Sequence, residues 1–431
     1  MPGYGAAALR EEVQVIKDMT RTIVGLVTAL SMGTIASAQI HEHEPAASTS
    51  QWHVMQDAMV YGLFNHQDGP RGGDELRVPN WWMGMFSRKV KSSDLTINTM
   101  FSLDALTVGK KGYRELFQVG EAFEGRPLID YQHPHDLFMQ LAVVWRIPVG
   151  AKTGFTLAGG PSAEPAIGPV AFMHRASAIE NPMSPLSHHT FDSTHIAFGV
   201  VTGAIDHGSW TLEGSVFNGR EPDEDRWDFD FGAMDSYAGR LWFRPREQWE
   251  FQVSSARLKS PEELGHGNIV RTTASGSWLK RDGDNFTAMT AAYGVNNGED
   301  VNRHSVLLEA TKRVGSFSAY GRLEFVEVET GVLLEDHSVE HSVKDTVAAV
   351  TLGAVRELPR WRRLESGIST AVTFYGVPDS LKPTHGKRPV SFQVFLRIRP
   401  AAGAMGRMWN MHMIKPMHPA TVDPHAGHQM N

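Results

Sequence analysis

The sequence VSFQVFLRIR, residues 390–399, decides the fold. Every second residue from Val390 to Ile398 is apolar, whereas Ser391, Gln393 and Arg397 between them are polar. Successive side chains of a β-strand point to opposite faces of the sheet. The stretch therefore predicts a strand with one apolar face and one polar, partly charged face.

The same alternation recurs along the chain from about residue 93 onward, in segments of about ten residues separated by Gly, Asp, Asn or Pro. Helical periodicity is scarce. We expect strands near residues 54–64, 79–88, 93–103, 137–147, 153–159, 194–205, 209–217, 236–245, 247–257, 269–280, 284–295, 304–313, 316–328, 344–356, 362–374 and 388–398. An all-β fold follows, an antiparallel transmembrane β-barrel of about 12 to 16 strands.

The connections between these strands alternate in length. Short turns that contain Gly lie at 206–208, 281–284 and 314–316, whereas the stretches 218–234, 258–268, 296–303, 329–343 and 375–387 are longer and polar. Outer-membrane barrels have short periplasmic turns and long outward loops. A soluble sandwich has no reason to keep the connections at one end of its strands consistently short. The alternative that stays open for the fold is a soluble periplasmic β protein.

Composition narrows the class of protein further. The 431 residues include no Cys and carry a formal net charge of −7, with no basic cluster, which argues against a nucleic-acid partner. Met19 to Ala38 is typical of a secretory signal that ends in Ala36-Ser37-Ala38. We expect the chain to divide into a misassigned start plus signal peptide (1–38), a disordered segment (39–53), the β-barrel (54–399) and a disordered Met/His-rich tail (400–431).

With this export signal, these alternating strands and this rhythm of turns and loops, the chain resembles bacterial outer-membrane β-barrel proteins of the porin-like class. Trp210, Trp242, Trp249, Trp278 and Trp361 lie near predicted strand ends, where an aromatic belt would stand at the boundary between lipid and water. The resemblance implies location in the outer membrane, contact with its lipid, a hydrated lumen and both termini in the periplasm.

Two stretches rich in histidine stand out between the strands. The first is residues 130–136, and the second is residues 160–195, where repeated prolines forbid continuous regular structure. Because a long irregular loop in a compact domain is usually functional, we expect an inward loop whose side chains converge on a divalent metal. The candidate ligands are His133, His135, Asp136, His174, His188, His189, Asp192 and His195. The competing interpretation is a structural network that ties the loop to the wall.

The carboxyl-terminal tail is a second candidate metal site. Thioether sulfur selects Cu(I) and imidazole suits Cu(II), so a flexible tract of both can hold copper in either oxidation state. The candidate ligands in the tail are Met408, Met411, His412, Met413, Met417, His418, His425 and His428. A solvated tail without function is the alternative.

An exported barrel with a Met/His-rich extension resembles the outer-membrane component of bacterial copper-resistance systems. That resemblance implies a protein without enzymatic activity that binds copper, or else zinc, for sequestration, resistance or passage. Two alternatives stay open. One is a general porin for small solutes with a structural His cluster, and the other is a metal-dependent enzyme in which Glu180 or Asp192 acts as general base.

Overall fold

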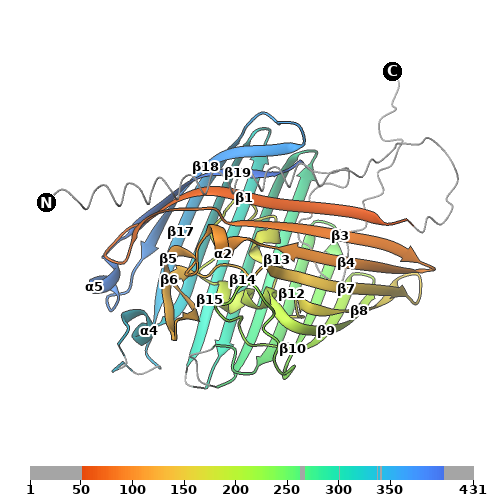
Figure 1. The fold of residues 1–431 in the computed structure, drawn as a ribbon, viewed down its shortest axis with the longest axis horizontal. Helices are drawn as coiled ribbons and strands as arrows, with labels where there is room; N and C mark the ends of the chain where they lie inside the picture. The colour runs from red at the N-terminus through yellow and green to blue at the C-terminus, as the bar shows by residue number, and fades with distance from the viewer. Residues whose placement is uncertain (1–50, 263–266, 300, 337, 340–341, 402–431) are drawn as a thin grey trace.

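A computed structural model describes residues 51–262, 267–299, 301–336, 338–339 and 342–401. In this part of the chain an antiparallel β-barrel dominates (Figure 1). Its wall strands are β1 (His53–Gln67), β2 (Gly73–Arg77), β3 (Asn80–Val90), β4 (Ser93–Phe101), β7 (Phe138–Pro148), β8 (Thr153–Ala163), β9 (Ala197–His207), β10 (Trp210–Asn218), β11 (Ser236–Arg246), β12 (Trp249–Leu258), β13 (Ile269–Asp282), β14 (Asn285–Asn297), β15 (Asn302–Val314), β16 (Phe317–Glu329), β17 (Lys344–Glu357), β18 (Leu364–Gly376) and β19 (Val390–Pro400).

The sheet closes on itself between its first and last strands. Strand β1 pairs with β19 on one side, from Val60 opposite Ile398 to His66 opposite Phe392. On its other side β1 pairs with β3 and then with β2, which therefore act as one interrupted strand. Within the described residues the wall is thus a closed barrel of 16 strands, as the alternation predicted.

The two faces of the wall divide as the sequence predicted. In β10, Leu212 is 58% exposed on the outside, whereas the next residue, Glu213, is 4% exposed and faces the lumen. In β12 the outward Val253 is 52% exposed and the inward Ser254 only 5%. The apolar side chains are therefore not buried between two stacked sheets, as a soluble sandwich would require.

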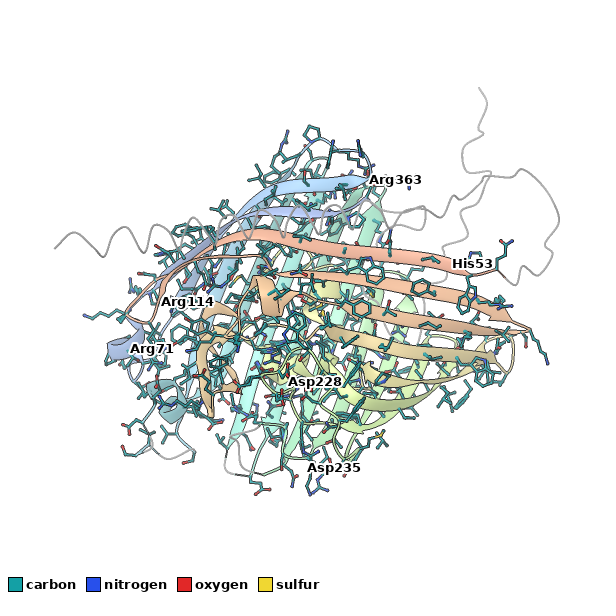
Figure 2. The ribbon with its side chains drawn as sticks, viewed as in Figure 1. His53, Arg71, Arg114, Asp228, Asp235 and Arg363 are labelled. Carbon is teal, nitrogen blue, oxygen red and sulfur yellow. The ribbon has the colours of Figure 1, made fainter. Side chains whose placement is uncertain are left out.

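The two ends of the barrel differ as well. Short connections at 91–92, 208–209, 247–248, 283–284 and 315–316 lie at the same end as the start of β1 and the end of β19. Most of the long connections lie at the opposite end, but the one expected at 296–303 spans only residues 298–301, which makes it shorter than the connection 358–363 at the short-turn end. In Figure 2 His53 marks the short-turn end, and Arg71 marks the long-loop end.

The tryptophans only partly form the expected belt. Trp210, Trp249 and Trp361 are 47%, 42% and 60% exposed. Trp210 and Trp249 are the first residues of β10 and β12, and Trp361 lies in the connection between β17 and β18, so all three stand at the short-turn end. The expectation for Trp242 was wrong, because this side chain is 1% exposed and faces the lumen. Trp242 and Arg240 are two residues apart in β11, so their side chains point to the same face of the wall. The guanidinium carbon of Arg240 lies 5.0 Å from the centroid of the Trp242 ring.

The expected signal peptide and nearly all of the expected 39–53 segment and 400–431 tail lie outside the described residues, so these expectations stay predictions. The described helices are α2 (Asp104–Thr107), α3 (His188–Phe191), α4 (Thr330–Leu334) and α5 (Lys382–His385). Among the described helices, none combines the length and apolar character that a membrane-spanning helix needs.

Candidate functional site: a histidine cluster in the barrel lumen

Two connections from the long-loop end enter the barrel, and together we call them the plug. The first, residues 102–137, contains α2 and the hairpin of β5 (Tyr113–Phe123) and β6 (Arg126–Gln132). The second, residues 164–196, contains only single helical turns, and most of its side chains are buried. The expected inward loop is therefore confirmed, and a second inward segment joins it.

Side chains of the wall hold the second plug segment in place. Arg175 donates from Nε to Glu309 of β15 at 2.6 Å and from Nη1 to Asp192 of the plug at 2.7 Å. At another contact Glu180, which is fully buried, forms ion pairs with Arg397 and Arg399 of β19. Because prolines prevent regular backbone pairing here, the wall supplies the partners that the buried polar groups need.

Four of the candidate histidines form a closed circuit, which we call the histidine ring: His133, His135, His188 and His195. Going round it, the imidazole centroids are 6.5 Å apart from His133 to His135 and 5.9 Å apart from His135 to His195. The circuit continues with 5.4 Å from His195 to His188 and closes with 6.4 Å from His188 to His133. Residues more than fifty positions apart in the sequence thus meet in the lumen.

The nitrogen atoms of the histidine ring are arranged alike. In all four imidazoles Nδ1 lies within hydrogen-bond distance of an oxygen atom. The contacts are His133 to the Pro134 carbonyl at 3.1 Å, His135 to Asp104 at 2.8 Å, His188 to the Asp192 carboxylate at 2.7 Å and His195 to the Asp192 carbonyl at 2.7 Å. For His135, His188 and His195 the oxygen acceptor at Nδ1 places the proton there and leaves a lone pair on Nε2, whereas His133 has an oxygen atom next to both of its nitrogen atoms.

The Nε2 atoms are mostly unused. Those of His135, His188 and His195 are buried and have no hydrogen-bond partner among the described residues. The Nε2 atom of His133 lies 3.1 Å from Glu121, a carboxylate that also accepts from Arg226. A buried polar atom without a partner is costly, so three of them on neighbouring imidazoles call for an explanation.

Burial favours the neutral form of these imidazoles. Desolvation lowers the pKa of His188 to about 4 and that of His195 to about 3, and it also lowers the pKa of His133 well below its ordinary value. For His133 the positive charge of Arg226 adds to the effect. Neutral imidazole is the form that can bind a metal.

The remaining candidate residues lie at different distances from the ring. His189 touches it, with its centroid 5.3 Å from that of His188 and 5.8 Å from that of His133. Asp192 orients two ring members, whereas Asp136 lies 3.5 Å from Arg226. His174 does not join the ring, because its imidazole packs edge-on against Trp81 at 5.2 Å. The candidate ligands from Met408 to His428 lie outside the described residues.

Sequence reasoning missed several members of the site. Asp104 and Glu121 contact ring histidines from a segment whose hairpin was not expected. It also missed methionines on the inward faces of four neighbouring strands, which pack with Met173 and Met183 of the plug. These are Met55, Met59, Met83, Met85, Met100 and Met139. A signal was present, because these methionines stand at positions where the alternation places polar residues elsewhere.

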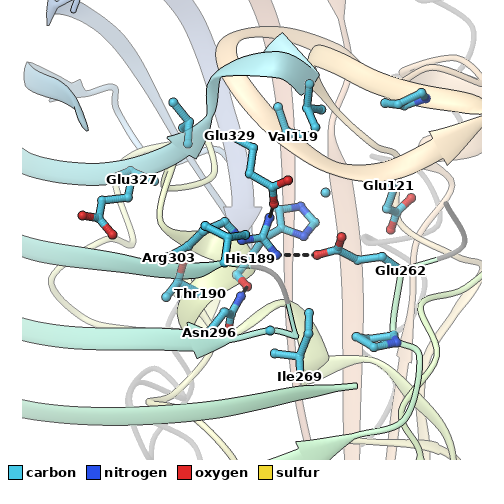
Figure 3. Close-up of a pocket in the computed structure, with 18 of the residues that line it drawn as sticks. Val119, Glu121, His189, Thr190, Glu262, Ile269, Asn296, Arg303, Glu327 and Glu329 are labelled. Carbon is cyan, nitrogen blue, oxygen red and sulfur yellow. Dashed lines mark hydrogen bonds and ion pairs between the residues drawn. The ribbon is translucent and has the colours of Figure 1, made fainter. Parts of the chain in front are cut away.

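A cavity of about 160 Å³ opens next to the cluster, toward the long-loop end (Figure 3). His189, Glu121 and Glu262 line it together with Arg303, whose guanidinium pairs with Glu262 at 2.8 Å and with Glu329 at 3.1 Å. His189 packs directly on Gly120, where a Cβ atom would lie 2.1 Å from the imidazole. The missing side chain at residue 120 therefore makes room for His189.

Close ligand spacing exists elsewhere in the described residues. Asp223, Asp228 and Asp230 have carboxylate oxygen atoms within 4.8 Å of one another, in the connection between β10 and β11. These three residues were not among the ligands expected from the sequence. No such compact triad of His or carboxylate ligands is found in the histidine ring as the described chain places it.

The chain is similar in fold to solved outer-membrane proteins. The anion-selective porin from Comamonas acidovorans superposes with a TM-score of 0.50 at 10% identity, over 81% of this chain and 100% of that porin. OprB of Pseudomonas putida gives a TM-score of 0.50 at 8% identity, over 81% and 94% of the two chains. At these identities the likeness establishes the fold. No known protein family matches the sequence, and no curated protein does.

Proposed function

We propose that the chain is an outer-membrane barrel of the porin type that gives small polar solutes a restricted passage. The observation that carries the proposal is the closed wall with an apolar outside and a polar inside, seen in neighbouring residues such as Leu212 and Glu213. Such a wall satisfies its backbone hydrogen bonds between strands and presents hydrocarbon to lipid. The similarity to the anion-selective porin, itself a protein of the same architecture, agrees with it.

The orientation follows from the connections. Short turns face the periplasm in barrels of this class, and long loops face outward. His53 begins the first wall strand and Pro400 ends the last one, and both lie at the short-turn end, so the chain would enter and leave the barrel on the periplasmic side. The cavity next to His189 would then open toward the outside.

The plug sets the size of what can pass. The cavity of about 160 Å³ is smaller than the roughly 300–1,000 Å³ of pockets that hold drug-sized ligands. A deeper cavity, between Met83 and His195, holds about 30 Å³. We therefore propose passage for ions and very small solutes, and no enzymatic role.

Glu180 and Asp192, the candidate general bases, are engaged by buried arginines, which favours a structural role for both.

Vesicle swelling tests the proposal. Purified protein is reconstituted into liposomes that are then diluted into solutes of rising size, from glycerol through arabinose to a disaccharide. Because glycerol also crosses lipid bilayers unaided, the rate in vesicles that contain heat-denatured protein is subtracted for each solute. We expect the largest excess swelling rate with the smallest solute and a steep fall with size. Equal rates with and without folded protein for every solute would contradict the proposal.

Metal handling is the second candidate function. The histidine ring, with three buried and unpaired Nε2 atoms, is the specific observation that favours it. We propose sequestration, resistance or passage of copper as this second function, and we propose that the Met/His-rich tail takes part in it.

A further inference from the structure

We propose that the histidine ring, His133, His135, His188 and His195, binds one divalent transition-metal ion inside the barrel, and that copper matches the site best. The inference does not depend on solute passage, because a barrel can hold an ion whether or not it conducts.

The first argument is the arrangement of donors. Histidines that bind metals nearly always donate their second ring N–H to a carboxylate or a backbone carbonyl, which fixes the tautomer and the orientation. All four members of the ring show this arrangement, through Asp104, Asp192 and the Pro134 carbonyl. Asp192 holds two of the rings, His188 through its carboxylate and His195 through its carbonyl. One residue thus sets the directions of two Nε2 atoms.

The second argument is burial without partners. A hydrogen-bonded structural network would use both nitrogen atoms of each imidazole. Here Nε2 of His135, His188 and His195 is buried and has no partner among the described residues. An ion that accepts their lone pairs would remove the cost of all three.

The third argument concerns distances. Bonds of about 2.0–2.1 Å between metal and nitrogen would place neighbouring ligand atoms about 3.4 Å apart in a tetrahedral site. In the histidine ring, as the described chain places it, no three ligand atoms of His or carboxylate side chains lie within 4.8 Å of one another, so the ring is wider than that. His188 and His195 lie on single helical turns, α3 and η2 (Ser193–His195), so small rotations of side chains on short elements would close it. The ring is therefore an expanded form of the site.

The surroundings offer an ion a way in from the long-loop end. Glu121 lines the cavity of about 160 Å³ at the long-loop end. It also lines a smaller cavity of about 20 Å³, which His133 and His195 line as well. His189 stands at the same boundary, next to His188. Carboxylate and imidazole donors thus lead from the mouth to the ring.

Thioethers on the far side of the ring favour copper. His195 also lines the cavity of about 30 Å³ whose wall includes Met83, Met100 and Met139. Imidazole suits both Zn(II) and Cu(II), whereas thioether sulfur selects Cu(I). A site with imidazoles on one side and thioethers on the other would retain copper in either oxidation state, an advantage that zinc would not gain.

The test uses the full-length protein in detergent, with His412, His418, His425 and His428 of the tail changed to Ala so that their imidazoles do not compete. After addition of Cu²⁺ and removal of excess by gel filtration, elemental analysis should find about one copper per chain. The electron paramagnetic resonance spectrum should show coupling to three or four nitrogen atoms. A protein without bound copper, or copper without nitrogen coupling, would overturn the proposal.

Substitutions then assign the ligands. His188→Gln and His195→Gln, made separately, should each weaken Cu²⁺ binding by more than about 10-fold, since even loss of an outer partner costs about 10- to 100-fold. His385→Gln is the matched control, because His385 is also fully buried but lies in α5, where its Nε2 atom contacts Asp130 and not the ring. Equal binding by all three variants, or equal loss in the control, would contradict the assignment.

Two further measurements keep the result clear. Heat-modifiable migration on gels shows whether each variant is folded, and a variant that fails is replaced by His135→Gln. Zn²⁺ added in place of Cu²⁺ should bind with lower affinity. Binding of Zn²⁺ in preference to Cu²⁺ would overturn the choice of copper, and vesicle swelling that persists in every ring variant would leave solute passage untouched.

Discussion

The wall and the plug satisfy the hydrogen bonds of their backbones in different ways. Wall strands pair their backbones with neighbouring strands along the whole barrel. The plug segment 164–196 has little regular structure, so side chains of the wall accept from its backbone: the amide of Ala166 donates to Ser215, that of Gly168 to Ser254 and that of Ser187 to Glu324. The stability of the plug therefore depends on contacts between residues far apart in sequence.

The largest expected effect comes from removing the main anchor of the plug. Arg175→Ala leaves Glu309 and Asp192 buried without their shared cation. Breaking a buried ion pair by removing one partner costs about 3–5 kcal/mol. We expect the free energy of unfolding to fall by about that amount, and protease to cut within 164–196 while the wall stays folded.

Arg220→Ala is the matched control for that variant. Arg220 pairs with Asp235 at 3.0 Å, but the two side chains are 38% and 33% exposed in a loop. An exposed pair contributes about 0–1 kcal/mol. Similar losses for the two variants would contradict the claim that buried ion pairs with the wall stabilise the plug more than an exposed pair stabilises a loop.

A smaller effect should appear as a dependence on pH in the hairpin segment of the plug. Burial raises the pKa of Glu115 from 4.5 to about 8, although Ser184 and Arg322 act in the opposite direction. The folded protein therefore keeps a proton that the unfolded chain releases, so this group makes stability fall as pH rises from about 4.5 to about 8. Glu115→Gln cannot ionise and should remove that fall.

The measurement is thermal unfolding in detergent at pH 5 and pH 8. The melting temperature of Glu115→Gln should exceed that of the wild type by more at pH 8 than at pH 5. Glu247→Gln, at an exposed turn, controls for the loss of one carboxylate. A difference between Glu115→Gln and wild type that is the same at both pH values would show that Glu115 is ionised when folded.

The wall could be predicted from the sequence because its determinants are local. Alternation with a period of two marks the wall strands from about residue 93 onward, and short turns such as 208–209 fix their ends, whereas the short strand β2 was not expected. The position of Trp242 on the lumen side was missed for a local reason too. It was assigned by its place near a strand end, although its parity with Arg240 put it on the lumen side.

The plug could be predicted only in outline. The density of histidine and proline pointed to an inward loop with a polar cluster, yet nothing local shows that His133 would meet His188. The hairpin of β5 and β6 was not predicted, because its register shifts twice and Phe117 and Asp130 take positive φ angles of 69° and 60°. Those irregularities erase the alternation on which strand prediction depends.

One measurement tests most directly whether lipid covers the apolar face of the wall. Because the chain has no Cys, single nitroxide labels can be placed through Val253→Cys, halfway along the outer face of β12, and Glu247→Cys, at a short turn. In phospholipid vesicles the label at residue 253 should collide mainly with oxygen and that at residue 247 mainly with a water-soluble nickel complex. Equal nickel collision rates at the two positions would contradict a membrane-spanning barrel.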